Sequence, residues 1–305
     1  MDRFTIQVPA STSNLGPGLD SLCLALQLYL KVVVKSRWDG RRKVNYRGVG
    51  AQILKDESES LISRAIQHTW SFIGFSGAGF DLDVRNEIPL SSGLGSSGAA
   101  VVAGIEIALN LAKKKLTIQE KVRLGYEMEG HADNILPSLL GGFIIALTTR
   151  NGHIEWVKCP FHSSIKIVAV TPEFAVSTRR AREVLPHEYS REDLVFNLQR
   201  TAALVASLST GKWEGGVDIM ADRIHQPYRA ELIPGLEEML TIKPNRDTLG
   251  IVLSGSGPSV LALVRAKPQE IGRQLVLEFS KAGYRSNVRV LKYDSRGVRI
   301  LGGKS

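Results

Sequence analysis

Residues 84–115 place glycines and serines between a proline and a run of small apolar residues, in the sequence VRNEIPLSSGLGSSGAAVVAGIEIALNLAKKK. Glycine has no Cβ, so the main-chain N–H groups of such a stretch can approach an anion closely. Residues 98–114 have the composition of a helix, and the unpaired N–H groups at the start of a helix attract negative charge. Ser96 and Ser97 add hydroxyl groups beside that start. The stretch therefore indicates a phosphate-binding loop, with a flexible glycine turn as the alternative.

Two well-known nucleotide-binding patterns do not fit this stretch. Gly93 to Gly98 matches G-x-G-x-x-G, but a dinucleotide site expects an acidic residue at the end of a strand about 20 residues later. Residues 113–115 are lysines instead, and residues 117–129 have helical spacing. The lysine that precedes the serine of a Walker loop is also missing. What is left is the chemistry of the loop itself, which offers main-chain donors and hydroxyl groups to an anion.

Two further loops have the same composition. Residues 9–20 read PASTSNLGPGLD and residues 253–259 read LSGSGPS, and both lie beside apolar segments. Asn14 and Asp20 are the polar groups of the first loop with specific chemistry, an amide and a carboxylate. Three such loops in one chain are hard to explain as turns alone. Each of them could bring main-chain donors to a single site.

The elements that must position these loops follow from the hydrophobic spacing. Strands are predicted at residues 4–10, at the end of 19–36, at 79–85, 141–148, 152–159 and 165–172, twice within 248–266, and at 286–293. Helices are predicted at residues 58–74, 98–114, 117–129, 191–211 and 268–284. Asp39 and Gly40 predict a hairpin turn. Strands and helices mix along the whole chain, which indicates an α+β protein with two domains, residues 1–160 and 161–305.

The composition is that of an ordinary globular protein of 305 residues, long enough for two domains. No stretch of about 18 apolar residues occurs, and the N-terminus lacks the apolar core of a signal peptide, so neither a membrane span nor export is expected. Cys23 and Cys159 are the only cysteines and lie far apart in the sequence. Lone thiols suit the cytoplasm, and they exclude a zinc cluster built on cysteine.

A net charge of +9 raises the question of an anionic partner. Much of the positive charge lies in residues 31–48, KVVVKSRWDGRRKVNYRG. Lys and Arg on edge strands commonly prevent edge-to-edge pairing, and the segment lacks the aromatic interleaving of a single-strand nucleic-acid binder. A nucleic-acid binder is an alternative that rests on this segment alone. Neither nucleic acid nor a membrane is the expected partner.

The three loops, in this order, resemble the three motifs of the GHMP kinase family. The middle motif of the family is P-x-x-x-G-L-G-S-S-x-A, and Pro89 to Ala99 match it in full. Three further stretches are similar to segments of the homoserine-phosphorylating branch of that family: EGHADNILPSLLGGF (129–143), TPEFAVSTRRAREVLP (171–186) and HQPYRAELIPG (225–235). The resemblance covers nearly the whole chain.

The resemblance implies a fold and an activity. The fold would be a two-domain α+β fold, with an ATP-binding N-terminal domain of the ribosomal protein S5 domain 2-like type and a ferredoxin-like C-terminal domain that completes the substrate site. The activity would be the ATP-dependent phosphorylation of the side-chain hydroxyl of L-homoserine to O-phospho-L-homoserine, in threonine biosynthesis, with Mg²⁺ as the metal ion and a homodimer as the assembly. Another small-molecule GHMP kinase and a non-catalytic metabolite-binding relative are the alternatives.

The resemblance also implies roles on the nucleotide side. The residues that would contact ATP are Pro89, Leu90, Ser91, Ser92, Gly93, Leu94, Gly95, Ser96, Ser97, Gly98 and Leu61. Ser97 and Glu129 match the metal-binding pair of the family, and Mg²⁺ prefers one or two protein oxygens together with phosphate oxygens and water. Glu127 is the alternative ligand, and a solvated acid at a helix end is the alternative role for Glu129. Family members commonly carry asparagine where this chain has Ser60, so a side-chain contact to adenine is open there.

On the acceptor side, the resemblance implies a pocket for a zwitterion. Arg182 and Arg229 match the carboxylate clamp of the family, a task that suits the planar guanidinium better than an ammonium. Asp20 would accept hydrogen bonds from the substrate ammonium. The pocket would be completed by Asn14, His131, Asn134 and Thr178. Arginines nearby in the sequence are the alternatives to the clamp, namely Arg179, Arg180 and Arg223.

Catalysis is expected to rest on Ser97, Glu129 and Asn134 without a protein base, because phosphoryl transfer asks mainly for positioning and for stabilisation of charge. Asp133 would be the obvious base, since an aspartate has that role in the mevalonate and galactose kinases. The homoserine branch is read as having asparagine at the corresponding position, here Asn134. The γ-phosphate or a water would then take the hydroxyl proton. The third glycine-rich loop is expected to form the floor of the site.

Overall fold

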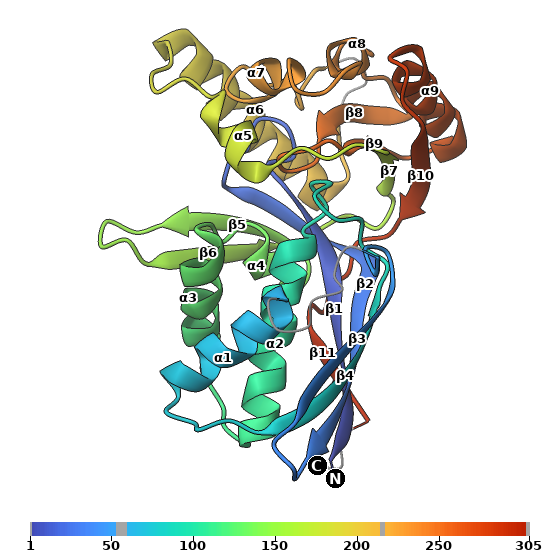
Figure 1. Ribbon diagram of the computed structural model, residues 1–305. Helices are drawn as coiled ribbons and strands as arrows, with labels where there is room; N and C mark the ends of the chain where they lie inside the picture. The colour runs from blue at the N-terminus through green and yellow to red at the C-terminus, as the bar shows by residue number, and fades with distance from the viewer. Residues whose placement is uncertain (1, 53–59, 214–216, 303–305) are drawn as a thin grey trace.

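The computed structural model describes residues 2–52, 60–213 and 217–302, and it shows two sheets that lie end to end, each with helices packed against it (Figure 1). The larger sheet is built from β1 (Arg3–Ser13), β2 (Leu22–Arg37), β3 (Arg42–Gly48), β4 (Gly79–Asn86), β5 (Phe143–Thr148), β6 (Ile154–Cys159) and β11 (Arg299–Leu301). The smaller sheet is built from β7 (Lys166–Pro172), β8 (Thr248–Leu253), β9 (Val260–Val264) and β10 (Ser286–Leu291). This mixture confirms the predicted α+β class.

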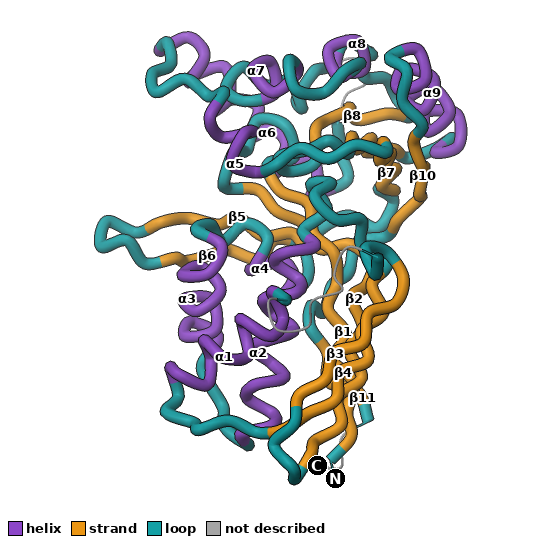
Figure 2. The backbone as a smooth tube through the Cα atoms, viewed as in Figure 1, coloured by secondary structure: helices purple, strands orange, loops and turns teal. Residues whose placement is uncertain are grey.

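The helices divide between the two sheets in the same way. Those on one face of the larger sheet, as Figure 2 shows, are α1 (Leu61–Phe72), α2 (Ser96–Ala112), α3 (Ile118–Glu129) and α4 (Ile135–Leu140). Those around the smaller sheet are α5 (Thr178–Glu183), α6 (Arg191–Thr210), α7 (Gln226–Ala230), α8 (Leu236–Leu240) and α9 (Pro268–Lys281). Every helix predicted from the hydrophobic spacing is present, and the short helices α4, α5, α7 and α8 are additional.

The helix that follows the glycine loop, α2, is buried on almost every side. Small residues make this close packing feasible: an added Cβ on Gly104 would collide with Ala65 of the neighbouring helix α1. The helix predicted at residues 98–114 begins earlier, at Ser96, which places both serines of the loop in its first turn. The helix predicted at residues 58–74 begins at Leu61, and residues 58 and 59 lie outside the described part of the chain.

The predicted hairpin around Asp39 and Gly40 is wrong. The chain does bend there, with a φ of 71° at Gly40, but β2 and β3 are not neighbours, because β4 lies between them and pairs antiparallel with β2 and parallel with β3. Burial explains this order. In β4, Phe80, Leu82 and Val84 are all buried, whereas most of the basic strand β3 faces solvent. The basic residues of β3 therefore lie on an edge strand, as their composition predicts.

The smaller sheet has the order β10-β7-β9-β8 with antiparallel neighbours. Since helices follow β7 and β9, the chain forms two β-α-β units that interleave in the ferredoxin-like arrangement. A separate apolar core lies between this sheet and helices α8 and α9, and it includes Val168, Leu253, Val260 and Phe279. The ferredoxin-like fold that the resemblance implies is therefore confirmed.

One strand was missed by sequence reasoning. The chain leaves the smaller sheet after β10 and returns to the larger one, where β11 pairs antiparallel with β1. Asp294 fixes this return, because its carboxylate accepts hydrogen bonds from the main-chain N–H groups of Arg296 and Gly297, both at 2.9 Å, and from the hydroxyl of Tyr29 at 2.9 Å. A strand of three residues is too short to show a period of two. No helix within the described residues has the length and apolar character needed to cross a bilayer.

Candidate active site

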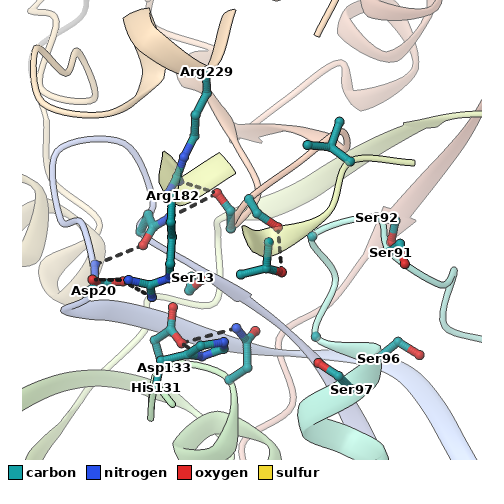
Figure 3. A pocket seen from close by; sticks show the side chains of 18 residues that line it. Ser13, Asp20, Ser91, Ser92, Ser96, Ser97, His131, Asp133, Arg182 and Arg229 are labelled. Carbon is teal, nitrogen blue, oxygen red and sulfur yellow. Dashed lines mark hydrogen bonds and ion pairs between the residues drawn. The ribbon is translucent and has the colours of Figure 1, made fainter. Parts of the chain in front are cut away.

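The three glycine-rich loops meet at one cavity of about 210 Å³, between the start of α2 and helix α5 (Figure 3). The first loop contributes Ser13, Asn14 and Asp20 to its wall, and the third loop contributes Gly255 and Ser256. Further polar side chains come from the segment between α3 and α4 and from helices α5 and α7. The structure thus brings all three loops to a single site, as their shared composition predicts.

The glycine loop ends in a helix start that is open to a ligand. Gly95, the residue before α2, has a φ of 69°, and no side chain within the described ranges caps this helix end. A Cβ on Gly95 would collide with Oγ of Ser11, and a Cβ on Gly93 would collide with the carbonyl oxygen of Ser254. Only glycine allows the loop to pack this closely. The first N–H groups of α2 are therefore available for an anion, and both serines of its first turn line the cavity.

The third loop holds the glycine loop in place. The hydroxyl of Ser254 donates a hydrogen bond of 2.7 Å to the carbonyl oxygen of Gly93. The main-chain N–H of Ser259 donates one of 3.0 Å to the carbonyl oxygen of Ser92. The supporting role that the sequence predicts for this loop rests on these bonds, which fix the glycine loop to the end of β8 and the start of β9.

A second cavity of about 210 Å³ adjoins the first and shares Ser91, Ser96 and Ser97 with it. Its wall is mostly apolar and includes Leu30, Tyr46, Leu61, Ile62, Leu90 and Ala100. An apolar cavity beside a phosphate-binding loop suits the base of a nucleotide. The hydroxyl of Ser60 is used elsewhere, since it accepts from the main-chain N–H of Ser63 at 3.2 Å and so caps α1.

Three of the residues predicted to contact the nucleotide are not among those that line the two cavities. The carbonyl oxygen of Pro89 accepts a hydrogen bond of 2.9 Å from the hydroxyl of Ser92. Leu94 is buried in the core beneath the loop. The Cα of Gly98 lies against Asn134, where an added Cβ would come within 3.0 Å of the asparagine Cβ. These residues support the shape of the loop and do not form the cavity wall.

The predicted metal-binding pair is brought together. The hydroxyl of Ser97, in the first turn of α2, donates a hydrogen bond of 2.7 Å to Oε2 of Glu129, the last residue of α3. Glu127 points elsewhere and pairs with Arg123 at 2.8 Å and with His68 at 3.1 Å. The described residues gather no cluster of three or more His, Cys, Asp or Glu that could hold a metal ion. The hydroxyl of Ser97 and the carboxylate of Glu129 are oxygen ligands of the kind that a hard cation uses when it takes few ligands from the protein.

A chain of polar contacts runs from His131 into the cavity. Nδ1 of His131 lies 2.6 Å from Oδ1 of Asp133, and the amide nitrogen of Asn134 donates to the same oxygen at 3.3 Å. The amide oxygen of Asn134 accepts a hydrogen bond of 2.9 Å from the hydroxyl of Ser11. Asn134 is thus held at both ends of its amide, with Asp133 behind it and the first loop beside it.

His131 and Asp133, the two ionisable groups among these polar contacts, shift each other's pKa. Burial alone would lower the pKa of His131, but the hydrogen bond and the charge of Asp133 outweigh it, so that this pKa lies above its ordinary value of 6.5. Burial alone would raise the pKa of Asp133, but the hydrogen bond and the charge of His131 outweigh it, so that this pKa lies below 3.8. The charged pair is therefore the favoured state near neutral pH.

This pair predicts how stability changes with pH. The contribution of Asp133 to the free energy of unfolding is present above pH 3.8 and is lost as the pH falls through its lowered pKa. The contribution of His131 is present below pH 6.5 and is lost as the pH rises through its raised pKa. We therefore expect the difference in unfolding free energy between the wild type and His131→Gln, measured by urea denaturation, to be largest between pH 3.8 and 6.5. A difference that does not change from acid to alkaline pH would contradict the charged pair, and His153→Gln, in the exposed turn after β5, is the control.

The two predicted clamp residues, Arg182 and Arg229, line the same cavity as the carboxylate of Asp20. Both guanidinium Nη atoms of Arg182 donate to the carboxylate of Asp20, at 2.9 and 3.2 Å, with side chains that are 42% and 49% exposed (Figure 3). Arg229 is buried, and it donates to the carbonyl oxygens of Ala181 at 2.9 Å and Gly255 at 3.0 Å. The cavity therefore offers positive and negative groups within a short distance of each other, which suits a zwitterionic ligand.

The arginines that were alternatives to the clamp do not line the cavity. Arg179 pairs with Glu183 at 2.7 Å on the exposed face of α5, and Arg180 is exposed on the same helix. Arg223 pairs with Glu192 at 3.2 Å at the start of α6. The structure thus separates these side chains from Arg182 and Arg229, which line the cavity.

Asn14 and Thr178 line the cavity and also hold its loops together. The amide of Asn14 donates to the carbonyl oxygen of Gly255 and accepts from the main-chain N–H of Asp20, both at 3.0 Å. The hydroxyl of Thr178 lies 3.4 Å from that of Ser256. Both side chains therefore fix the spacing between the first loop, the third loop and α5, besides any contact with a ligand.

Sequence reasoning missed several residues of the two cavities. Ser13 and Ser256 lie within loops that were recognised, but their small hydroxyls carried no separate signal. Val176 precedes α5, and Leu30 and Tyr46 belong to strands that were interpreted only as sheet. Their place at the site depends on how the larger sheet turns toward α1 and α2, which a local pattern does not record.

A helix start open to an anion, an adjoining apolar cavity and a pocket with fixed charges of both signs suit a small-molecule kinase, and the comparisons with known proteins give its type. A family model described as GHMP kinases N terminal domain matches residues 60–142, and one described as GHMP kinases C terminal matches residues 202–281. The chain is similar to the homoserine kinase of Aquifex aeolicus, with 38% identity over 97% of this chain and 98% of that protein. It is also similar to the homoserine kinase of Clostridium kluyveri, with 33% identity over 99% of both chains.

A solved structure agrees with these relatives. The crystal structure of homoserine kinase from Cytophaga hutchinsonii matches 99% of this chain and 98% of that one, with a TM-score of 0.84 and 26% sequence identity. The chain belongs to the homoserine kinases of the GHMP kinase family. It is therefore a phosphotransferase with an alcohol group as acceptor.

Proposed function

We propose that the protein transfers the γ-phosphoryl group of ATP to the side-chain hydroxyl of L-homoserine, giving O-phospho-L-homoserine for threonine biosynthesis. The observation that carries this proposal is the position of Asp20, Arg182 and Arg229 in the same cavity as the start of α2. A phosphate donor held at the helix start would face an amino acid held by these charges. Effective phosphoryl transfer needs this juxtaposition above all.

ATP would span the two cavities. Its base would lie among the apolar side chains near Leu61, and its phosphates would lie along the glycine loop against the first N–H groups of α2. Ser97 and Glu129 would hold Mg²⁺, which when bound neutralises phosphate charge during transfer. The hydroxyl and carboxylate are already 2.7 Å apart, which supports a site that forms without large movements.

The amino acid would enter with its carboxylate toward Arg182 and Arg229 and its ammonium toward Asp20. Without a ligand, Asp20 and Arg182 pair with each other. A zwitterion would supply each of them with a partner of the opposite charge, so neither would be left unpaired. His131, Asn134 and Thr178 would then border the side-chain hydroxyl of the substrate.

The proton of that hydroxyl would leave without a protein base. Asp133 is the nearest candidate, but its carboxylate is buried, and it has a lowered pKa because the contacts with His131 outweigh the effect of burial. Such a carboxylate is a weak base. The proton would pass to the γ-phosphate or to a water, while Asn134 orients the substrate and the helix start stabilises the charge on the transferring group.

The variant Asp133→Asn tests this step. We expect kcat to fall by less than about a hundredfold, because a general base typically contributes a factor of 10² to 10⁴. Steady-state kinetics and homoserine binding by calorimetry would be measured together. A fall in kcat beyond about a thousandfold with unchanged homoserine affinity would identify Asp133 as a base. His131→Gln, which removes the partner of Asp133, is the matched comparison.

We further propose a division into two domains, a location and an assembly for the protein. The N-terminal domain would comprise residues 1–160 and bind ATP, and the C-terminal domain, residues 161–305, would complete the substrate site. The protein would act in the cytoplasm as a homodimer. The two free cysteines, Cys23 and Cys159, support a reducing compartment.

The activity is tested by a coupled assay of ADP release with Mg²⁺ and ATP, across homoserine, mevalonate, galactose and shikimate. Turnover of homoserine well above that of the other alcohols is the expected result. Turnover of another substrate alone would identify a different GHMP kinase activity. Binding of ATP without release of ADP from any substrate would identify a non-catalytic relative, an outcome that the adjacent pair of Ser97 and Glu129 argues against.

A further inference from the structure

His225 lies directly behind the substrate cavity and is completely buried, at the residue before α7. Its two ring nitrogens reach two different parts of the site. Nε2 lies 2.7 Å from the carbonyl oxygen of Gly16 in the first loop, and Nδ1 lies 3.2 Å from Nη1 of Arg229 one helical turn later. The ring therefore stands between the loop that carries Asp20 and the guanidinium that faces the cavity.

The chemistry of the two partners fixes the form of the ring. A guanidinium can only donate, so Nδ1 must accept, and the ring proton must be on Nε2, which donates to Gly16. Only the neutral ring can do both. Burial lowers the pKa of His225, with Asp222 and Asp20 opposing this effect and Arg229 adding to it, so the neutral form is the stable one near neutral pH.

The ring completes the set of acceptors that orient Arg229. Nε of Arg229 donates to the carbonyl oxygen of Ala181, and Nη1 donates to that of Gly255 and to His225. These three acceptors come from α5, from the third loop and from the residue before α7, and none of these bonds uses Nη2. The plane of the guanidinium is thus set by the protein, and the two N–H groups of Nη2 are left for a ligand.

The main chain around His225 is fixed as firmly as its ring. The carboxylate of Asp222 accepts from the main-chain N–H of His225 at 3.0 Å. The amide nitrogen of Asn197, in α6, donates to Asp222 at 2.7 Å and to the carbonyl oxygen of Pro17 at 3.1 Å. Gly16, Pro17 and His225 are therefore parts of one buried network, which holds the ring against the first loop.

We propose that His225 is a positioning residue that couples the first loop to Arg229 and thereby sets the distance between the group that accepts the substrate ammonium and the group that binds its carboxylate. The inference rests on the proposed function, because it concerns how the same site recognises an α-amino acid. His225 lines neither the cavity at the start of α2 nor the apolar cavity beside it. Its loss should therefore weaken the binding of the amino acid and spare that of the nucleotide.

The test is a set of purified full-length variants, measured by steady-state kinetics with homoserine and ATP. His225→Leu keeps the bulk and removes both bonds, and it should raise KM for homoserine about tenfold to a hundredfold, as expected when a buried charged donor loses its acceptor. KM for ATP should stay within about twofold. His225→Gln carries a donor and an acceptor at a similar spacing, and it should recover most of the lost affinity. His153→Leu, in the exposed turn after β5, is the control.

A double-mutant cycle separates positioning from a merely structural role. If His225 acts through Arg229, then His225→Leu should change KM for homoserine by less than about threefold when Arg229→Lys is already present. Equal effects in both backgrounds, or a loss of thermal stability with unchanged KM for homoserine, would overturn the inference. If His225→Leu does not fold, His225→Asn takes its place. The shorter asparagine side chain can reach Arg229 or Gly16 but not both. An unchanged KM for homoserine in His225→Asn would overturn the inference equally. A wild type that does not phosphorylate homoserine overturns the proposed function itself.

Discussion

Replacing Glu129 by glutamine is expected to lower kcat about a hundredfold to a thousandfold, the range found when one electrostatic contact to a reacting group is removed. The amide has the same shape as the carboxylate and lacks its charge. It can still accept from the hydroxyl of Ser97, so the local packing at the start of α2 should survive. What is lost is the anionic oxygen that a hard cation prefers.

The measurement is a titration of activity with Mg²⁺ at saturating ATP and homoserine. For Glu129→Gln we expect a higher Mg²⁺ concentration at half-maximal rate and an almost unchanged KM for homoserine. Glu127→Gln is the matched control, because Glu127 lies on the same helix and pairs with Arg123 and His68 instead. Wild-type rates and wild-type Mg²⁺ dependence in Glu129→Gln would exclude this carboxylate from the metal site.

The contrast between Glu127 and Glu129 shows what sequence can predict at this site. The glycine loop, the helix after it and the polar loops on either side are local features, so their composition was enough to recognise them. The phosphate-binding role proposed for the loop follows from general properties of glycine and of helix starts. The choice between two glutamates two residues apart depends on which way α3 faces, and sequence alone supported it only through the family resemblance.

Long-range contacts account for most of what was not predicted. The bond from Ser254 to Gly93 and the bond from Ser11 to Asn134 join residues far apart in the chain. Single hydroxyls of this kind leave no periodic pattern. The ion pair between Asp20 and Arg182 is another long-range contact of this kind. Each residue was expected to bind the substrate, but their pairing with each other was not expected.

The wrong hairpin has a different cause. Asp39 and Gly40 do form a bend, so the local signal was correct. A turn signal says that the chain changes direction, and it does not say which strand comes to lie alongside. Strand β4, in which apolar residues alternate with charged ones, is buried more completely than β3, so it takes the central position and leaves the basic strand at the edge. The strand order in the larger sheet therefore depends on which strand buries more apolar surface. A local turn signal does not contain that information, because it requires comparing strands across the whole sheet.

Replacing Arg229 by lysine is expected to be the most damaging conservative change in the substrate pocket. A lysine keeps the charge, but its three N–H groups cannot serve Ala181, Gly255 and His225 in the plane that the guanidinium occupies and also leave a donor free for a carboxylate. Removing one partner of a buried, hydrogen-bonded charge pair costs about 2–5 kcal/mol. This corresponds to a rise of about thirtyfold to several thousandfold in KM for homoserine.

The same kinetics separate this loss from general damage to the fold. KM for ATP should stay within about threefold of the wild type, because Arg229 lies on the far side of the cavity from the apolar nucleotide cavity. Arg182→Lys should be milder, since that side chain is 42% exposed and water can replace part of its hydrogen bonding. Arg179→Lys, on the exposed face of α5, is the control. If Arg229→Lys bound homoserine as the wild type does, the carboxylate would have to lie elsewhere, and the orientation proposed for the amino acid would be wrong.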